Sequence, residues 1–213
     1  MVYTLVGLYC LEQHKKQTES ALLIGFYVLY TFSFCGTEAV DAMQKFKVGL
    51  FVGRFQPLHR GHMHALGFAG ASCEKLIVAV GSAQESGTEK NPLPARVRMK
   101  IIRTAIRNSK INEKVIRFVM VPDFGNGDAW FNYIIRRVPK IDVVFSGDPD
   151  TKRIFRSHKI TVVTPAWHKR HRFSATKVRH RIRKGGRWHG LVPKSVVKHI
   201  GAHESKFKSW KII

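Results

Sequence analysis

The stretch KVGLFVGRFQPLHRGHMH, residues 47–64, decides which fold this chain can adopt. It opens on an apolar run, residues 48–52, of the kind found in parallel strands that are buried on both faces. Gly53, Pro57 and Gly61 then break the chain within nine residues, and apolar side chains recur at helical spacing beyond them. The pattern predicts a strand, a short loop and a helix.

The predicted loop gathers polar side chains where an anion could bind. Such loops lie at the carboxyl ends of parallel strands, and the helix that follows offers free N–H groups to a phosphate. Arg54, Gln56, His59 and His62 fall within or beside the loop. A His-x-Gly-His tetrapeptide alone is weak, because both histidines could be ordinary surface residues. Their convergence with an arginine and an amide favours a phosphate site, although the spacing is neither Walker-type nor Gly-x-Gly-x-x-Gly.

The composition is that of a globular protein with an unusual charge. With 213 residues and 44% hydrophobic content, the chain can form one domain with a full core. Its formal net charge is +23, and the part beyond residue 42 holds 35 basic and 10 acidic residues. This excess favours anionic partners such as nucleotides, nucleic acids or anionic lipid surfaces, although solubility is a simpler explanation. Cys10, Cys35 and Cys73 have no metal-ligand spacing, which favours a reduced, intracellular setting.

Four further apolar segments continue the alternation of strands and helices. We expect strands at residues 75–80, 115–121, 142–145 and 160–163. Repeated alternation of this kind predicts an α/β protein with right-handed crossovers. The expected sheet is mostly parallel, has five or slightly more strands, and is flanked by helices in the manner of nucleotide-binding folds.

The segment FSATKVRHRIR, residues 173–183, is a second candidate phosphate site. Ser174 is placed to cap a helix, and Thr176 and Arg179 fall in its first turns. Hydroxyl groups, free N–H groups and a guanidinium could therefore meet one phosphate chain there. Alone, the segment could equally be a basic amphipathic helix, but beside the His-x-Gly-His loop it favours a polyphosphate site.

Several blocks of the sequence, taken in order, resemble one enzyme family. GRFQPLHRGH, GSAQES, NPLPARVRM and FSATKVR are similar to blocks of the archaeal-type nicotinamide-nucleotide adenylyltransferases, in the HxGH nucleotidylyltransferase superfamily. The similarity runs from about Phe46 to about Ile200. It implies the nucleotidylyltransferase variant of a Rossmann-like fold and transfer of AMP from ATP to nicotinamide mononucleotide, yielding NAD and pyrophosphate. It also implies that Mg²⁺ accompanies ATP, with its protein ligands unassigned.

The same resemblance assigns roles to individual residues. Those expected to be catalytic are His59, His62 and Arg179. Those expected to bind ATP are Gly53, Arg54, Phe55, His59, Gly61, His62, Ser174, Thr176 and Arg179. Those expected to bind the mononucleotide are Gln56, Ser82, Ala83, Gln84, Lys90, Arg98, Asp123 and Trp130. The mononucleotide phosphate can attack ATP directly, so positioning and charge stabilisation suffice for catalysis.

The sequence departs from the family pattern at three places near the expected site. Arg96 stands within Ala-Arg-Val, where the pattern has Ala-Gly-Glu. Gly127 occupies a position usually held by asparagine, with Asn126 one residue earlier, and Asp148 also replaces an asparagine. The Asp148 carboxylate would weaken anion binding unless a metal ion or a basic neighbour faces it. For Trp130 two roles stay open, namely stacking on the nicotinamide ring or anchoring its helix in the core.

Two other functions fit the sequence less closely. Another adenylyltransferase of the superfamily would act on a flavin or pantetheine-phosphate acceptor, and the departures at Gly127 and Asp148 keep it open. A nucleic-acid-binding protein on the same scaffold would account for the basic stretches 168–172 and 177–187. Weak, non-specific binding of nucleic acid by this basic surface is expected even of an enzyme.

The two ends of the chain are expected to lie outside the catalytic domain. Residues 1–42 contain an apolar run, 21–35, that is shorter than the roughly 18 to 20 residues of a membrane-spanning helix. We expect residues 1–42 to be an extension upstream of a true start at Met43, or else a membrane or partner-binding segment. The nucleotidylyltransferase domain is expected at 43–200, followed by a frayed basic tail at 201–213. By resemblance, the protein is expected to be a cytoplasmic homo-oligomer.

Overall fold

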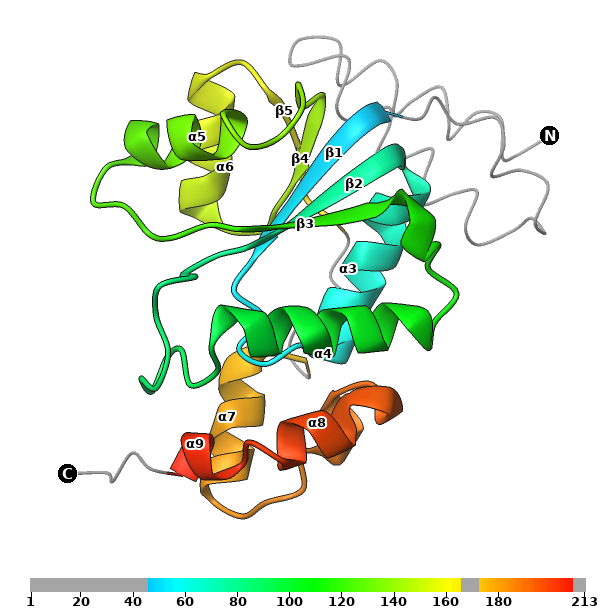
Figure 1. Ribbon diagram of the computed structural model, residues 1–213, viewed down its shortest axis with the longest axis vertical. Helices are drawn as coiled ribbons and strands as arrows, with labels where there is room; N and C mark the ends of the chain where they lie inside the picture. The colour runs from blue at the N-terminus through cyan, green and yellow to red at the C-terminus, as the bar shows by residue number, and fades with distance from the viewer. Residues whose placement is uncertain (1–45, 166–172, 209–213) are drawn as a thin grey trace, which may run out of the picture. The chain divides into compact units, whose positions relative to one another are not determined.

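A parallel five-stranded sheet forms the centre of the fold (Figure 1). The computed structural model describes residues 46–165 and 173–208, which belong to a unit spanning Gln44–Ile213. From edge to edge the strands are β3 (Ile116–Met120), β2 (Cys73–Val80), β1 (Phe46–Gly53), β4 (Val143–Phe145) and β5 (Thr161–Val163). Every neighbouring pair is parallel, so the expected Rossmann-like sheet is confirmed.

Helices connect the strands and follow the last of them. The α-helices are α3 (Arg60–Ala71), α4 (Ala95–Arg107), α5 (Gly127–Ile135), α6 (Pro149–Ser157), α7 (Ala175–Arg183), α8 (Val197–Gly201) and α9 (Ser205–Lys208). Short 3-10 helices are η2 (Glu113–Val115), η3 (His189–Leu191) and η4 (Lys194–Val196). Helix α5 begins at Gly127 because the Asn126 side chain caps it there.

Side chains alternate between the two faces of the sheet and build two hydrophobic layers. In β2, Leu76, Val78 and Val80 belong to the larger layer, whereas Ile77 and Ala79 belong to the smaller one. The larger layer packs against α3, α4 and the helices from α7 onward, and the smaller one packs against α5 and α6 (Figure 1). Both faces are covered, which explains why this strand is apolar without interruption.

The strand order fixes where a ligand can bind. The chain passes from β1 to β2 and β3 on one side of the sheet, and then returns to add β4 and β5 on the other. The direction of winding therefore reverses between β1 and β4, and ligands of such sheets bind at the carboxyl ends of the strands at this point. The loop that follows β1, residues 54–59, opens there.

The described fold continues past Ile200, where the sequence predicts that the domain ends. Instead of a frayed tail, the chain forms α9, and Phe207 is 2% exposed within the larger hydrophobic layer. Burial of one large aromatic side chain supplies enough apolar contact to hold a short helix in place.

Two parts of the chain for which the sequence makes predictions lie outside the described residues. These are residues 1–42 and the basic stretch 168–172. Within the described part of the chain, no helix is long and apolar enough to cross a membrane.

Replacing Phe207 by alanine tests whether α9 belongs to the folded domain. We expect Phe207→Ala to lower the free energy of unfolding by about 3–5 kcal/mol, because a buried phenyl ring is lost. Urea denaturation measures the change, with the exposed Lys206→Ala as a control that should stay within about 0.5 kcal/mol. Equal stabilities of the two variants would show that α9 does not contribute to the core.

Candidate active site

Two histidines cap the start of α3 for each other. The Nδ1 atom of His59, the N-cap residue, accepts a hydrogen bond from the backbone N–H of His62 at 3.2 Å. In return, Nδ1 of His62 accepts one from the N–H of His59 at 3.3 Å, and the two rings stack with centroids 3.6 Å apart. This is a capping box in which imidazoles take the roles usually played by Ser or Thr and Glu.

Burial keeps both histidines neutral at physiological pH. It lowers the pKa of His59 to about 4. Burial, together with the neighbouring His59, holds the pKa of His62 well below its usual range. Because each Nδ1 accepts a hydrogen bond, the single ring proton of each imidazole lies on Nε2. The start of α3 therefore carries two neutral N–H donors suited to phosphate oxygens.

Gly61 brings the two predicted phosphate-binding segments together. A Cβ atom added there would lie 3.1 Å from the ring of His59 and 3.3 Å from the Cβ of Phe173, which precedes α7. Both distances are tighter than ordinary van der Waals contact, so a side chain would push α3 and the start of α7 apart. The two segments predicted separately from the sequence thus meet at one place.

Arg179 reaches from α7 to the loop after β1. Ser174 caps this helix by accepting a hydrogen bond from the N–H of Lys177 at 3.2 Å. Arg179 donates through Nη1 to the carbonyl of Gln56 at 2.8 Å and through Nη2 to Oγ1 of Thr176 at 3.3 Å. Its Nε is buried without a hydrogen-bond partner among the described residues. The guanidinium is fixed between the two segments with one donor unsatisfied.

Three arginines form a cluster of positive charge around this point. Burial lowers the pKa of Arg179, and Arg54 and Arg183 lower it further, whereas Glu89 acts in the opposite direction. Arg183 pairs through Nη2 with Oε1 of Glu89 at 2.7 Å, and the adjacent Lys90 is exposed. A cluster of like charges of this kind favours an anionic ligand. Sequence analysis missed Arg183, although its four-residue spacing from Arg179 on a predicted helix was a usable signal.

Arg98 is buried between the loop after β1 and the loop that joins β2 to α4. It therefore does not face a substrate, contrary to the prediction from the sequence. It is 0% exposed, and its Nε and Nη2 donate to the carbonyls of Leu93 and Ser82 at 3.0 and 2.9 Å. Its Nη1 donates to the carbonyls of Arg54 at 2.7 Å and Gly81 at 2.6 Å. Burial lowers its pKa to about 10, so it stays charged at neutral pH. Most of its N–H groups are thereby occupied by backbone oxygens.

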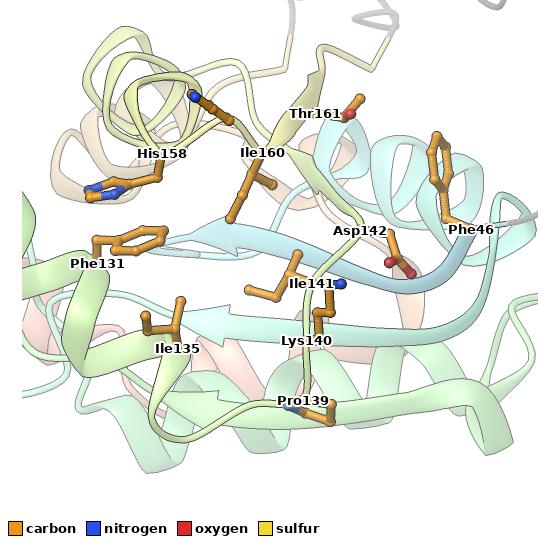
Figure 2. Close-up of a pocket in the computed structure, with 11 residues that line it drawn as sticks. Phe46, Phe131, Ile135, Pro139, Lys140, Ile141, Asp142, His158, Ile160 and Thr161 are labelled. Carbon is orange, nitrogen blue, oxygen red and sulfur yellow. The ribbon is translucent and has the colours of Figure 1, made fainter.

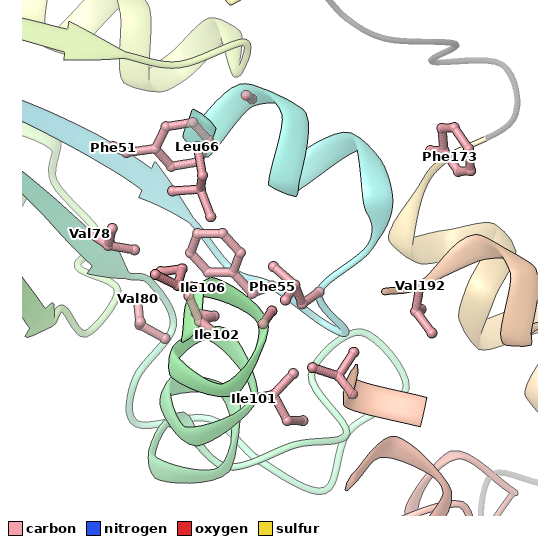
Figure 3. Packing of buried hydrophobic residues seen from close by; sticks show 14 of the residues in the cluster. Phe51, Phe55, Leu66, Val78, Val80, Ile101, Ile102, Ile106, Phe173 and Val192 are labelled. Carbon is pink, nitrogen blue, oxygen red and sulfur yellow. The ribbon is translucent and has the colours of Figure 1, made fainter. Parts of the chain in front are cut away.

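Two residues of the β1 loop also turn inward, contrary to their expected contact with a ligand. The buried Gln56 donates through Nε2 to the carbonyl of Leu93 at 2.8 Å and accepts from its N–H at 3.0 Å. Phe55 lies in the larger hydrophobic layer with Ile102 and Val192 (Figure 3). Their side chains position the loop, and only their backbone is left to face a ligand.

The loop after β2 borders a hollow and is hydrogen-bonded to the loop after β3. Oε1 of Gln84 accepts a hydrogen bond from the N–H of Asp123 at 2.9 Å, and its Nε2 lies 3.5 Å from Oδ2 of Asp123. Ala83 and Gln84 line a hollow of about 460 Å³, a size suited to a small ligand. Ser82 is buried and has a left-handed φ of 49°. Gln84 therefore borders the hollow and is hydrogen-bonded to Asp123, whereas mononucleotide binding by these residues stays a prediction.

The departures near α5 have local structural reasons. The Oδ1 atom of Asn126 accepts from the N–H groups of Asp128 at 2.7 Å and Ala129 at 3.4 Å, so the displaced amide serves as the N-cap. A Cβ at Gly127 would lie 3.0 Å from Ile154, so the glycine lets α5 approach α6.

Asp148 and Trp130 likewise take structural roles. The carboxylate of Asp148 accepts from the N–H of Thr151 at 2.8 Å and from its hydroxyl at 2.9 Å, and thus caps α6. Its charge faces a helix N-terminus, which stabilises it there. Trp130 is half-buried and meets Phe155 edge-on with centroids 5.8 Å apart. This contact supports the anchoring role for Trp130.

A second hollow lies at the other end of the sheet (Figure 2). It has a volume of about 590 Å³ and is bordered by Phe46, Asp142 and Thr161, at or near the amino ends of β1, β4 and β5. The stacked rings of Phe131 and His158, 3.7 Å apart, form another wall. None of the residues predicted for the site lines it, so volume alone does not locate the chemistry.

The parallel sheet, with two helix starts and three arginines gathered at its carboxyl ends, is the arrangement of a nucleotidyltransferase, and comparisons with known proteins identify the chain as one. Residues 50–181 match the family model described as cytidylyltransferase-like. Because the match covers more than half of the chain, the protein belongs to this family.

Curated archaeal proteins are similar to the chain over most of its length. The nicotinamide-nucleotide adenylyltransferase of Thermococcus kodakarensis is 38% identical over 154 residues, which cover 72% of this chain and 82% of the relative. That of Pyrococcus furiosus is 39% identical over 155 residues, with coverages of 72% and 82%. That of Saccharolobus solfataricus is 35% identical, covering 71% of this chain and 88% of its own. The resemblance inferred from the sequence is confirmed.

Solved structures share the fold at low sequence identity. A bifunctional NMN adenylyltransferase/ADP ribose pyrophosphatase from Francisella tularensis, complexed with AMP and a Mn ion, has a TM-score of 0.65 and 19% identity. The match covers 77% of this chain but only 52% of that one, so the chain spans about half the length of the Francisella protein. A chain from Vibrio parahaemolyticus has a TM-score of 0.52 and 13% identity, with coverages of 73% and 99%.

The buried histidine cap predicts a loss of stability in acid. An unfolded histidine binds a proton near pH 6.5, whereas folded His59 does so only near pH 4. Between these values the unfolded chain binds more protons, so stability is full above pH 6.5 and falls as the pH drops to 4. We expect His59 to contribute about 3 kcal/mol of this loss, with His62 acting in the same direction.

Urea denaturation at pH 7 and pH 4 measures the acid effect. The matched variant is His59→Asn, in which the amide oxygen can still cap α3 but cannot titrate. Its stability should fall less between the two pH values than that of the parent protein. If both proteins lost the same free energy of unfolding between pH 7 and pH 4, His59 would not be the buried, neutral group described above.

The clamp formed by Arg98 predicts a structural effect of its replacement. Arg98→Met removes the hydrogen bonds to four backbone carbonyls, of which those of Leu93 and Ser82 keep a second donor, and we expect the free energy of unfolding to fall by about 3 kcal/mol. Arg98→Lys retains an ammonium donor and should lose less. Amide hydrogen exchange should accelerate at residues 81–84 in both variants. Unchanged stability and exchange, with weakened mononucleotide binding, would restore the substrate-facing role.

Proposed function

We propose that this chain is a nicotinamide-nucleotide adenylyltransferase, which transfers AMP from ATP to nicotinamide mononucleotide. The observation that carries the proposal is the meeting of the histidine cap on α3 with Arg179 on α7 at the loop after β1. Neutral N–H donors and a fixed cation at two helix starts suit a polyphosphate. The names of the archaeal relatives support the choice of nicotinamide mononucleotide as acceptor.

The reaction needs no covalent participation by the protein. An oxygen of the mononucleotide 5′-phosphate attacks the α-phosphorus of ATP, the bond to the bridging oxygen breaks, and pyrophosphate leaves. We assign the Nε2–H group of His62 to the α-phosphate, where charge develops, and that of His59 to the triphosphate. Arg179 and the hydroxyls of Ser174 and Thr176 hold the leaving pyrophosphate. Positioning and charge stabilisation account for the rate.

The mononucleotide is held by the loops after β2 and β3. Gln84 and Asp123 hydrogen-bond to each other beside the hollow and present polar groups to the nicotinamide or ribose. Lys90, which is exposed in the β2 loop, binds the phosphate. Arg98 contributes indirectly, because it fixes the carbonyls of Gly81 and Ser82.

A divalent metal ion, Mg²⁺ in this proposal, accompanies ATP and shares the charge of its phosphates. The described residues contain no group of three or more His, Cys, Asp or Glu side chains that could hold a metal. Around the β1 loop the two imidazoles present N–H groups, because each Nδ1 already accepts a hydrogen bond, and the arginines are cations, so these side chains suit phosphates rather than metal ions. The ligands of the ion are then mainly phosphate oxygens and water.

The setting of the enzyme is also part of the proposal. It works in the cytoplasm, where ATP and the mononucleotide are available, and it forms a homo-oligomer. Arg181, Lys184 and Arg187 are exposed on or after α7 and support weak, salt-sensitive binding of nucleic acid.

A direct assay tests the reaction and the leading histidine together. The purified chain, with ATP and Mg²⁺, is given nicotinamide mononucleotide, nicotinate mononucleotide, flavin mononucleotide or pantetheine phosphate. We expect NAD to form from the first of these. His62→Ala should lower kcat by about 10²- to 10³-fold, because a donor at the developing charge is lost. The exposed His180→Ala should keep full activity.

Circular dichroism controls for unfolding, since His62 also caps α3. Product from the flavin or pantetheine acceptor alone would replace the proposed substrate. No product from any acceptor, in a folded protein, would contradict an enzymatic function and favour the nucleic-acid-binding alternative.

A further inference from the structure

An ion pair lies near Arg179, the arginine that holds the pyrophosphate in the proposed function. Glu89, in the loop after β2, pairs with Arg183 on α7 at 2.7 Å. Arg183 follows Arg179 by four residues, so the two project from the same face of the helix. Arg54 and Arg183 both lie close enough to Arg179 to depress its pKa. The three guanidiniums therefore share one region of the site.

Two of these guanidiniums have an unsatisfied donor. The Nε atoms of Arg179 and Arg183 are both buried, and neither has a hydrogen-bond partner among the described residues. Buried N–H groups without partners are rare in folded proteins and are costly when they occur. Two of them on one helix face, next to an assigned phosphate site, indicate that an anion completes the arrangement.

The two partners of the ion pair are exposed to very different extents. The side chain of Arg183 is 19% exposed, whereas that of Glu89 is 60% exposed. Glu89 can therefore turn into solvent at little cost, because its carboxylate is already largely hydrated while it is paired. A polyphosphate carries more charge than one carboxylate and makes charge-assisted hydrogen bonds. It can displace Glu89 from an arginine that stays in place.

We propose that Arg183 is a further ATP-binding residue, which receives the polyphosphate tail in exchange for Glu89. In the free protein, Glu89 neutralises Arg183 and reduces the repulsion among the three arginines. When ATP binds, its terminal phosphates take over the guanidinium and the carboxylate turns to solvent. Glu89 thus competes with the nucleotide for the site. The inference rests on the proposed function for the identity of the nucleotide, but the polyphosphate subsite can be tested without catalysis.

Calorimetric titration of the full chain with inorganic tripolyphosphate, and separately with ATP, tests the exchange at fixed ionic strength. Arg183→Met keeps the apolar stem and removes the charge, and it should raise both Kd values about tenfold or more. Glu89→Gln removes the competing charge and should lower them about two- to fivefold. In the double variant Glu89→Gln should have no further effect. Arg183→Lys should restore part of the affinity.

Arg181→Met is the matched control, because Arg181 is an exposed arginine on the same helix. It should change both Kd values less than twofold. The inference is overturned if Arg183→Met binds tripolyphosphate as the parent does, or if Glu89→Gln weakens binding. If the exchange is observed but no acceptor yields a dinucleotide in the activity assay, the polyphosphate subsite stands and the proposed reaction fails. If NAD is made but Arg183→Met leaves tripolyphosphate binding unaltered, the reaction stands and the subsite fails.

Discussion

The whole site depends on one buried guanidinium. Removing Arg98 from water is costly, and the cost is offset by hydrogen bonds to the carbonyls of Arg54, Gly81, Ser82 and Leu93. These carbonyls come from the loop after β1 and from the start and the end of the connection between β2 and α4. One side chain thus sets the distances among these three places. Two of these hydrogen bonds lie where the backbone has a positive φ angle. Ser82 has one itself, and Arg54 directly precedes Phe55, which has another.

The candidate site contains two kinds of hydrogen-bond donor, which are charged arginines and neutral histidines. In the proposed function, the cations Arg54, Arg179 and Arg183 meet the negative charge of a polyphosphate, whereas the neutral His59 and His62 supply hydrogen bonds without net charge. The histidines can remain neutral because each also satisfies a free N–H group at the start of α3. The Nδ1 atom of each ring caps the helix, and the proposed function assigns phosphate recognition to the Nε2–H group of the same ring.

The sequence predicted the sheet, the family and the two segments that meet at Gly61, because hydrophobic periodicity and local motifs report directly on backbone structure. It did not predict which way side chains point within the loops. Gln56 and Arg98 turn inward to backbone carbonyls, which depends on contacts with residues tens of positions away. Asp148 proved to be a helix cap, and Phe207 a core residue. Such roles are set by tertiary neighbours that a local pattern does not contain.

The buried position of Phe207 also has a kinetic consequence. The larger hydrophobic layer covers strands and helices made early in the chain, but it is completed by α7, α8 and α9, which are synthesised last among the described elements. While the chain is still emerging from the ribosome, α3 and α4 lack the apolar side chains that will shield them. Contacts over such long sequence separations form slowly and late. Until those last helices are made, we expect the apolar faces of α3 and α4 to stay exposed to other apolar surfaces.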